Sequence, residues 1–258
     1  MKEIYKRILS GIIGIMLLLM ILFKGGYLLY FSVLLISLIG LREFYKALEV
    51  KKIVPCYYLG YFGTLGIYFF YFFRSTYLIP FATIYVLIML ATVIFNKNMT
   101  IEGLSVTILG VIYIPIMLLH LLFLSETIYI YLVFVVAFGT DTFAYIAGNL
   151  FGKNKLCPSI SPNKTIEGSI GGTLGTVLIV MLFSFYFNIK PVWMMILFSI
   201  ISSLIAQLGD LVASKIKRIS GIKDYGFIMP GHGGVLDRFD SIIFTAPVVY
   251  YFISIFIN

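Results

Sequence analysis

Nine apolar segments, each long enough to form a helix, follow one another along the chain. They cover roughly residues 8–23, 26–41, 55–73, 77–95, 104–124, 127–150, 166–187, 191–213 and 242–257. A helix needs about 20 mostly apolar residues to cross a membrane, and in lipid a helix satisfies its own backbone hydrogen bonds. The runs are too long for the strands of a membrane barrel. The pattern therefore predicts an all-α, polytopic membrane protein with about nine transmembrane helices.

The composition agrees with this pattern. The chain of 258 residues is 61% hydrophobic and 12% charged, whereas a soluble domain carries about 25% charged residues. No interval between the apolar segments is long enough for a separate soluble domain. We expect one membrane-embedded domain over residues 1–258, in which residues 1–125 form mainly apolar spans and residues 126–258 carry the chemistry.

The basic residues are distributed unevenly between the loops that nine spans would create. If the N-terminus is cytoplasmic, every one of the 19 Lys and Arg residues except Lys24, Arg74 and Lys190 falls on the cytoplasmic side. Because cytoplasmic loops carry an excess of Lys and Arg, this distribution predicts a cytoplasmic N-terminus. Topology and contact with the anionic head groups of a lipid bilayer explain most of the net charge of +8. We therefore expect no nucleic-acid partner.

Two of the later apolar segments carry polar residues at helical spacing. Asp141 lies inside segment 127–150. A polar stripe starts in segment 191–213 and continues beyond it. Its residues follow at steps of four, three, four and three: Ser203, Gln207, Asp210, Ser214 and Lys217. A carboxylate at membrane depth is costly, which makes Asp141 and Asp210 functional candidates. The alternative is that the polar residues only form hydrogen bonds between packed helices.

Two loops beside these segments mix cations with turn-forming residues. In "SPNKTIEGSIGG" (161–172), Pro162 and Asn163 mark a turn, and Thr165 and Glu167 are typical of a helix start. The glycines that follow favour either close helix packing or a ligand that passes close to the backbone. The second loop, "KDYGFIMPGHGGVLDRFDS" (223–241), combines Lys, Asp, His and Arg with four glycines.

Together these regions hold the groups that phosphate chemistry needs. The carboxylates are Asp141, Asp210, Asp237 and Asp240, and Mg²⁺ prefers oxygen ligands and bridges to substrate phosphates. Lys and Arg bind phosphate oxygens, and a glycine-rich backbone can wrap an anion. The combination indicates metal-assisted phosphoryl or nucleotidyl transfer, in which positioning and charge neutralisation dominate.

The run "SKIKRISGIKDYGFIMPGHGGVLDRFDS" (214–241) closely resembles the C-terminal signature of the phosphatidate cytidylyltransferases, also called CDP-diacylglycerol synthases. The segments "DTFAYIAGNLFGK" and "SPNKTIEGSIGG" resemble upstream parts of this family, so the likeness covers about residues 139–241; Met229 stands where a plain aliphatic residue is expected. The resemblance implies transfer of the cytidylyl group of CTP to phosphatidic acid, which gives CDP-diacylglycerol and pyrophosphate for phospholipid synthesis. It also implies an integral protein of a bacterial-type inner membrane, with its active site on or near the cytoplasmic side.

The resemblance assigns roles to particular residues. Asp210 and Asp237 look like the ligands of Mg²⁺, with room for more than one ion, and their separation of 27 positions allows both to reach one site. The residues expected to act in catalysis are Asp210, Asp237, Lys217, Arg238 and His232. Those expected to bind substrate are Ser161, Asn163, Lys164, Ser214, Arg218, Lys223, Gly233, Gly234, Asp141 and Asp240. The alternative for Lys217 and Arg218 is that their charged ends only reach the membrane interface and bind no substrate. The alternative for His232 is that it only supports the glycine turn.

Two other functions stay open at this point. A CTP-dependent lipid kinase of the dolichol or diacylglycerol type would need the same nucleotide and metal, although the full GHGG-x-x-DR-x-D run favours the cytidylyltransferase. An ion-coupled secondary transporter could use Asp141 and Asp210 as ion sites, but transporters often contain paired repeats and this chain has no internal repeat. Because membrane enzymes with a lipid-accessible groove are often dimers, we also expect a homodimer.

Overall fold

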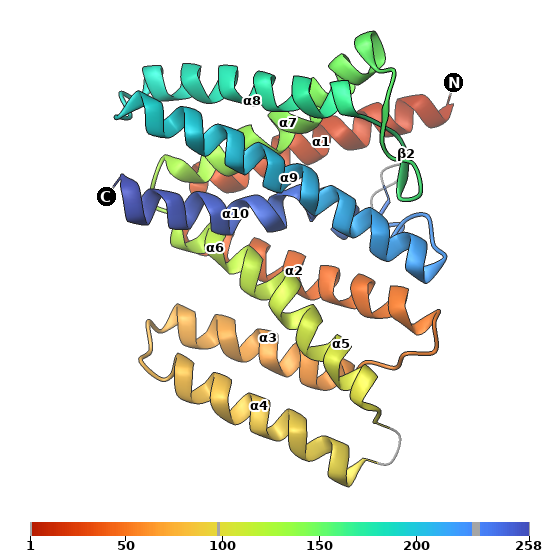
Figure 1. Cartoon of the computed structure of the whole chain (residues 1–258). Helices are drawn as coiled ribbons and strands as arrows, with labels where there is room; N and C mark the ends of the chain where they lie inside the picture. Colours follow the sequence, from red (N-terminus) through yellow and green to blue (C-terminus); the bar gives the residue numbers. More distant parts are fainter. Residues whose placement is uncertain (1, 97–98, 229–232, 258) are drawn as a thin grey trace. The chain divides into compact units, whose positions relative to one another are not determined.

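The computed structural model describes residues 2–96, 99–228 and 233–257, with side chains from residue 9 onward. The chain divides into two compact units. Figure 1 shows the helices and strands coloured along the sequence. Unit 1 contains residues 1–122 and 219–237, and unit 2 contains residues 123–218 and 238–258. Each unit is described by itself below. The expectation of a single membrane-embedded domain over residues 1–258 stays a prediction.

Each of the nine predicted apolar segments lies on helical structure. The helices are α1 (Lys2–Lys24), α2 (Gly26–Glu49), α3 (Tyr57–Phe72), α4 (Leu78–Phe95), α5 (Ile101–Val111), η1 (Ile112–Ile116), α6 (Met117–Phe123), α7 (Tyr129–Phe151), α8 (Ile166–Tyr186), α9 (Val192–Ser220) and α10 (Leu236–Phe256). In the described ranges, seven helical segments are long and apolar enough to cross a membrane, with α5, η1 and α6 counted as one. Helix α3, with 16 residues, and the apolar part of α1, Leu9–Lys24, are shorter. The all-α polytopic membrane fold is confirmed, while the number of spans and the cytoplasmic N-terminus stay predictions.

In unit 1, buried tyrosine hydroxyls form hydrogen bonds between helices. Tyr45 of α2 is fully buried, and its hydroxyl donates to the carbonyl of Thr107 on α5 at 2.7 Å. Tyr68 of α3 is also fully buried, and its hydroxyl lies 2.8 Å from that of Ser37 on α2. Because an unpaired hydroxyl would be costly in an apolar interior, these bonds fix how α2, α3 and α5 pack.

The chain between α5 and α6 contains a π-helical turn at Ile112–Ile116, which includes Pro115. A proline has no N–H to donate and crowds the preceding turn of a helix, so a wider local turn accommodates it. The carbonyl of Pro115 accepts the Tyr68 hydroxyl at 3.3 Å. The helix therefore continues through the proline and forms one candidate span, Ile101–Phe123.

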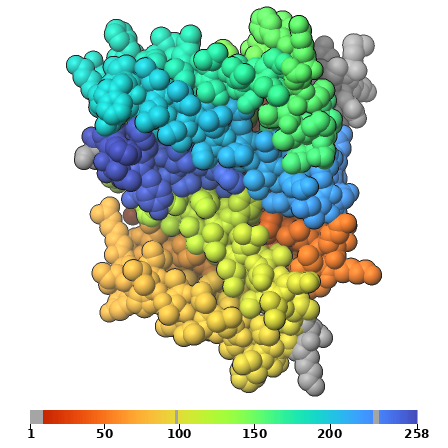
Figure 2. Space-filling model, viewed as in Figure 1, coloured from red at the N-terminus to blue at the C-terminus, as the bar shows by residue number. Residues whose placement is uncertain are grey.

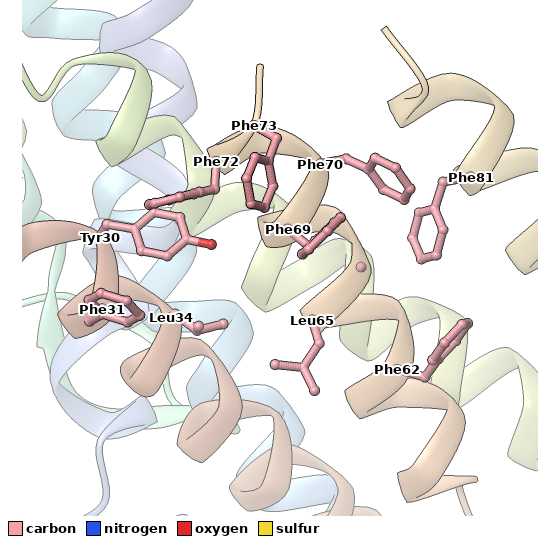
Figure 3. A pocket seen from close by; sticks show the side chains of 11 residues that line it. Tyr30, Phe31, Leu34, Phe62, Leu65, Phe69, Phe70, Phe72, Phe73 and Phe81 are labelled. Carbon is pink, nitrogen blue, oxygen red and sulfur yellow. The ribbon is translucent and has the colours of Figure 1, made fainter. Parts of the chain in front are cut away.

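Unit 1 also contains an apolar pocket of about 600 Å³ between α2, α3 and α4 (Figure 3). Its lining is almost entirely aromatic and aliphatic and includes Tyr30, Phe69 and Phe81. The lining suits a hydrocarbon group. It has no cation to bind a phosphate and no carboxylate to bind a metal. The pocket therefore does not meet the needs of nucleotide chemistry.

In unit 2, a row of glycines on α8 lets this helix pack closely against α7. A Cβ atom on Gly172 would lie 2.9 Å from the Cβ of Ala144 and 3.0 Å from the carbonyl oxygen of Thr140. Next to this contact the hydroxyls of Thr140 and Thr176 are 2.8 Å apart. Of the two explanations for the glycines, close helix packing is confirmed here.

The opposite side of α8 is apolar and exposed. Ile170, Leu174, Leu178 and Leu182 follow one another at steps of four residues and form a stripe on this side. Figure 2 shows α8 at the surface of the unit. A stripe of this kind suits contact with lipid in a membrane protein.

A short hairpin connects α7 to α8. Strands β1 (Lys155–Cys157) and β2 (Ser161–Thr165) are antiparallel, and Thr165 caps α8 by accepting the N–H of Gly168 at 3.1 Å. The predicted capping role of Thr165 is confirmed, but the turn predicted at Pro162 and Asn163 is wrong, because both residues lie in β2 and the turn covers 158–160. A two-stranded hairpin consists of edge strands only, where a proline is tolerated.

Helices α9 and α10 extend further than the hydropathy pattern predicts. The predicted segments end at 213 and start at 242, whereas α9 continues to Ser220 and α10 begins at Leu236. Polar and charged residues in the extra turns lower the hydropathy there without breaking the helix. Asp237 and Asp240, expected in a loop, therefore lie in the first turns of α10.

Candidate functional site

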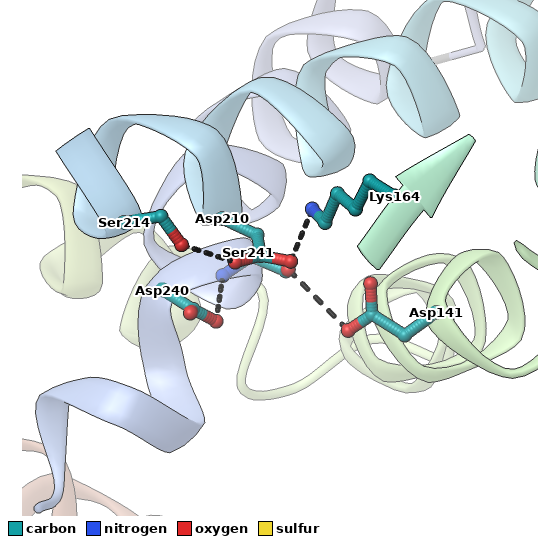
Figure 4. A network of polar contacts seen from close by, with 6 residues as sticks. All are labelled: Asp141, Lys164, Asp210, Ser214, Asp240 and Ser241. Atoms are coloured by element: carbon teal, nitrogen blue, oxygen red, sulfur yellow. Dashed lines mark hydrogen bonds and ion pairs between the residues drawn. The ribbon is translucent and has the colours of Figure 1, made fainter. Parts of the chain in front are cut away.

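Four elements of unit 2 bring three carboxylates and a lysine together (Figure 4). We call Asp141 of α7, Asp210 of α9 and Asp240 of α10, with Lys164 of β2, the acidic cluster. These residues are 23 to 99 positions apart along the chain, so only the folded unit assembles them. All four are among the residues that the sequence singled out.

Asp210 has the most contacts within the acidic cluster. The ammonium group of Lys164 forms an ion pair with its Oδ2 atom, and both side chains are about one-quarter exposed. The hydroxyl of Ser214, one helical turn further along α9, donates to its Oδ1 atom at 3.2 Å. Both oxygens of Asp210 are thus oriented while the group stays accessible to a ligand.

The other two carboxylates are linked through Ser241 on α10. The backbone N–H of Ser241 donates to Oδ1 of Asp240 at 2.7 Å, and its hydroxyl donates to Oδ2 of Asp141 at 3.4 Å. Asp141 and Asp240 each lie within electrostatic reach of Asp210. Three carboxylates at this spacing repel one another, so the cluster attracts cations.

Three basic side chains partly offset this repulsion. The charges of Lys164 and Arg238 act on Asp141, and the charge of Lys217 acts on Asp240. The cluster therefore combines groups that attract a metal ion with groups that attract phosphate. This is the mixture of charges that a triphosphate and its cation require.

The polar stripe on α9 divides into a packing part and a site part. The hydroxyl of Ser203 donates to Thr173 Oγ1 at 3.2 Å, and the amide of Gln207 donates to the carbonyl of Ser169 at 3.3 Å. For Ser203 and Gln207 the alternative of hydrogen bonds between helices is therefore confirmed. The next turn brings Asp210 to the cluster.

Gly209 allows α10 to approach α9 beside Asp210. A Cβ atom at this position would lie 2.7 Å from the carbonyl oxygen of Asp240. Any larger residue would push the two helices apart and separate Asp210 from Asp240. The glycine that precedes Asp210 in the sequence is a signal that could have indicated this approach.

The hairpin and the end of α9 are connected by Arg218. Its Nε atom donates to the carbonyl oxygen of Ile160 at 3.2 Å. Lys164 shares β2 with Ser161, which is half-buried, and Asn163, which is exposed. The contact of Arg218 therefore helps to hold the strand that carries Lys164.

In unit 1, Asp237 holds the described residues on either side of positions 229–232. Its Oδ2 atom accepts the N–H of Tyr225 at 2.8 Å and the N–H of Gly234 at 2.9 Å. Gly233 has a backbone φ of +86°, which favours glycine, and a Cβ there would lie 2.9 Å from the same oxygen. One carboxylate oxygen thus joins the two ends of the loop.

Glu43 is the residue of this region that sequence reasoning missed. It lies on α2, is 6% exposed, and accepts the N–H of Val235 at 3.0 Å and that of Leu236 at 2.8 Å. An acidic residue flanked by Leu41 and Phe44 was the available signal.

The predicted site residues are distributed over both units. Unit 2 contains Asp141, Ser161, Asn163, Lys164, Asp210, Ser214, Lys217, Arg218, Arg238 and Asp240. Unit 1 contains Lys223, which is exposed, with Gly233, Gly234 and Asp237. His232 lies outside the described residues. The predicted pairing of Asp210 with Asp237 around one ion joins residues of different units and stays a prediction.

The donor chemistry of the acidic cluster fits a hard divalent cation. Its carboxylate oxygens are the ligands that Mg²⁺ prefers. Across the described ranges, no three His, Cys, Asp or Glu residues are grouped closely enough to hold an ion by themselves.

A comparison with known families identifies the kind of protein that carries this cluster. The model of the Cytidylyltransferase family matches residues 5–256, which is nearly the whole chain. The chain belongs to this family. As a member of the cytidylyltransferase family, the protein is a nucleotidyltransferase and an integral membrane protein.

Three bacterial relatives agree with the family match. The phosphatidate cytidylyltransferase of Staphylococcus haemolyticus is 38% identical over 255 residues, which cover 94% of this chain and 96% of that protein. The phosphatidate cytidylyltransferase of Staphylococcus saprophyticus is 36% identical, and that of Staphylococcus aureus strain COL is 35% identical, with the same coverage of both chains. The likeness therefore extends through the N-terminal helices as well as the signature region.

Proposed function

We propose that this protein transfers the cytidylyl group of CTP to phosphatidic acid, which gives CDP-diacylglycerol and pyrophosphate for phospholipid synthesis. Membership of the cytidylyltransferase family and the names of the bacterial relatives support the reaction. The observation that carries the proposal is the acidic cluster, in which Asp210 pairs with Lys164 among helices of a membrane protein. A lipid substrate requires a site that is built into such helices.

The reaction requires charge neutralisation more than a strong base. An oxygen of the lipid phosphate attacks the α-phosphorus of CTP, a new P–O bond forms, and the bond from the α-phosphorus to the bridging oxygen breaks as pyrophosphate leaves. The attacking phosphate is already an anion, so no proton needs to be removed. Two unit charges 4 Å apart repel by about 4 kcal/mol at an effective dielectric constant of 20. The cations of the site offset this repulsion.

The side chains of unit 2 have distinct roles in this proposal. Lys164, Lys217 and Arg238 bind phosphate oxygens of CTP or lipid, because their charges act on the acidic cluster where the anions must meet. Ser214 orients Asp210. Arg218, with Ser161 and Asn163, extends this binding surface along β2.

The remaining assignments rest on the signature sequence alone. Lys223 binds phosphate, and His232 contacts a phosphate or braces the glycine turn. The N–H of Gly234 already donates to Asp237, so it is less available to a substrate phosphate. Asp237 keeps its predicted role as a metal ligand.

Asp210 would hold Mg²⁺, with Asp141 and Asp240 as neighbouring carboxylates. When bound, the ion neutralises phosphate charge and polarises the phosphoryl group under attack. With its carboxylate on the ion, Asp210 would leave Lys164 able to bind a phosphate oxygen. The carboxylates supply the negative potential that concentrates the cation.

The protein lies in a bacterial inner membrane in this proposal, with its site near the cytoplasmic side, where CTP is available. The distribution of Lys and Arg supports this direction. Cys157 in the hairpin should then react with a membrane-impermeant maleimide only in inverted vesicles. Labelling of Cys157 in intact cells would contradict the orientation.

The homodimer expected from the sequence is also part of the proposal. The exposed apolar stripe on α8 leaves a helix face available for contact within the membrane. The mass of the detergent-solubilised protein, corrected for bound detergent, should equal two chains. A mass of one chain at all protein concentrations would contradict it.

The reaction itself is tested with CTP labelled at two different phosphorus atoms. Purified protein receives phosphatidic acid, Mg²⁺ and CTP labelled on either the α- or the γ-phosphate. We expect the α-label in the lipid fraction and the γ-label in pyrophosphate. A lipid alcohol in place of phosphatidic acid serves as the control and should give no labelled lipid.

The same experiment distinguishes the other functions. A CTP-dependent lipid kinase would place the γ-label in the lipid and release CDP. An ion-coupled transporter would leave both labels in CTP. Either outcome would overturn the proposal.

A further inference from the structure

Glu43 is an unusual residue for its position in the molecule. Among the residues that the structure describes, it is the one buried side chain of the Asp, Glu, Lys and Arg types. Leu41 and Phe44 beside it are also buried. Burial of a carboxylate is costly unless the group is paired and hydrogen-bonded, so its partners must compensate.

The partners of Glu43 are backbone amides nearly 200 positions away. Oε1 accepts the N–H of Val235 at 3.0 Å, and Oε2 accepts the N–H of Leu236 at 2.8 Å. Both donors lie at the start of α10, where the first N–H groups have no acceptor within the helix. A carboxylate at this end of a helix also interacts favourably with the helix dipole. Each oxygen therefore has its own donor.

Two glycines of the loop make room for this carboxylate. A Cβ atom on Gly234 would lie 2.6 Å from both oxygens of Glu43, and one on Gly226 would lie 3.0 Å from its Cδ atom. The loop therefore fits around Glu43 only because these positions lack side chains.

Glu43 and Asp237 together take up a set of backbone donors in the loop. Asp237 accepts the N–H groups of Tyr225 and Gly234, and Glu43 accepts those of the next two residues, Val235 and Leu236. Three consecutive amides thus donate to carboxylates of the protein itself. The backbone that leads into Asp237 is fixed by Glu43.

We propose that Glu43 is a positioning residue for the cytidylyl transfer reaction, because it holds the start of α10 and so fixes the backbone that carries Asp237. This inference rests on the proposed role of Asp237. Glu43 itself contacts no reactant in this proposal. Its carboxylate acts through the amides of Val235 and Leu236.

The test compares Glu43→Gln with Glu43→Asp and with Glu49→Gln, which changes an exposed glutamate on the same helix. A glutamine side chain has one acceptor oxygen, so one amide of α10 would face an N–H₂ group. We expect kcat of Glu43→Gln to fall by about 10- to 100-fold, the range that corresponds to a lost hydrogen bond to a charged group. Glu43→Asp keeps the charge and should recover part of the loss, and Glu49→Gln should match the wild type.

Backbone hydrogen exchange shows whether the substitution acts at the start of α10. A fall in kcat at an unchanged melting temperature then separates a positioning role from a merely structural one. In Glu43→Gln, peptides that cover 233–240 should exchange faster by about 10-fold, while peptides from 243–256 exchange as in the wild type. If Glu43→Gln cannot be purified, Gly234→Ala replaces it, because its Cβ atom would displace the same carboxylate.

Three outcomes would overturn the inference: unchanged exchange at 233–240, unchanged kcat, or a lower melting temperature with full activity in the remaining folded protein. The exchange experiment does not depend on substrate. A wild-type protein without cytidylyl transfer activity would overturn the proposed function, whereas the contact of Glu43 with α10 would still be tested by exchange.

Discussion

Asp210→Asn abolishes cytidylyl transfer, with an expected fall in kcat of about 10³-fold, as for the loss of a preorganised charged group in an active site. Asparagine has nearly the same shape and can still accept the hydroxyl of Ser214. It carries no charge, so Lys164 loses its ion-pair partner and the proposed ion loses a ligand. The measurement is the initial rate of lipid labelling from α-labelled CTP at saturating Mg²⁺.

Two further variants show whether the effect belongs to the acidic cluster. Glu126→Gln removes an exposed carboxylate from unit 2, outside the cluster, and should keep wild-type activity. Lys164→Met removes the partner of Asp210, and its effect should be less than additive with that of Asp210→Asn, because the two residues form one ion pair. An Asp210→Asn protein with a wild-type melting temperature and more than about one-tenth of the activity would contradict the role of the cluster in catalysis.

Removal of divalent metal is expected to stop the reaction almost as completely. The nucleotide and the lipid are both anions, and the proposed site also contains the carboxyl groups of the acidic cluster. Repulsion of about 4 kcal/mol for each pair of unit charges at 4 Å corresponds to a rate about 10³-fold lower, at roughly tenfold for each 1.4 kcal/mol. The measurement is the rate after treatment with EDTA, followed by titration with Mg²⁺.

The controls for this prediction separate loss of the ion from loss of the protein. EDTA that is saturated with Mg²⁺ beforehand should leave the rate unchanged, and added Mg²⁺ should restore the activity of the chelated sample. The chelated protein should keep its melting temperature, because hydrogen bonds and helix packing hold the described part of unit 2 together. Full activity in EDTA, with no other divalent cation present, would contradict the proposed metal.

The fold class and most of the polar site were predictable from local sequence. Apolar runs of helical length indicate membrane helices, since lipid leaves the backbone no other partner for its hydrogen bonds. Asp141 and Asp210 stood out because a carboxylate in such a run is costly. Asp240 is among the carboxylates that the sequence singles out, Lys164 is assigned by the resemblance, and the structure brings both into the same cluster.

The errors concern polar residues that lie in regular secondary structure. The start of α10 was placed about six residues too late, because hydropathy falls where charged side chains occupy the first turns. Similarly, Pro162 and Asn163 were assigned to a turn, although an edge strand tolerates both. Hydropathy measures the cost of transferring residues to lipid, and it carries no information about which backbone groups have partners.

The sequence by itself determined that the chain is a helical membrane protein of the cytidylyltransferase kind, because apolar length and short polar signatures are local properties. Only the tertiary structure decided which polar residues share a site and which pack helices together. Ser203 and Asp210 belong to one stripe, yet one binds α8 and the other pairs with Lys164. Likewise, nothing near Glu43 in the sequence indicates its partners, Val235 and Leu236. Such contacts depend on how distant segments meet, and a local pattern of residues does not specify this.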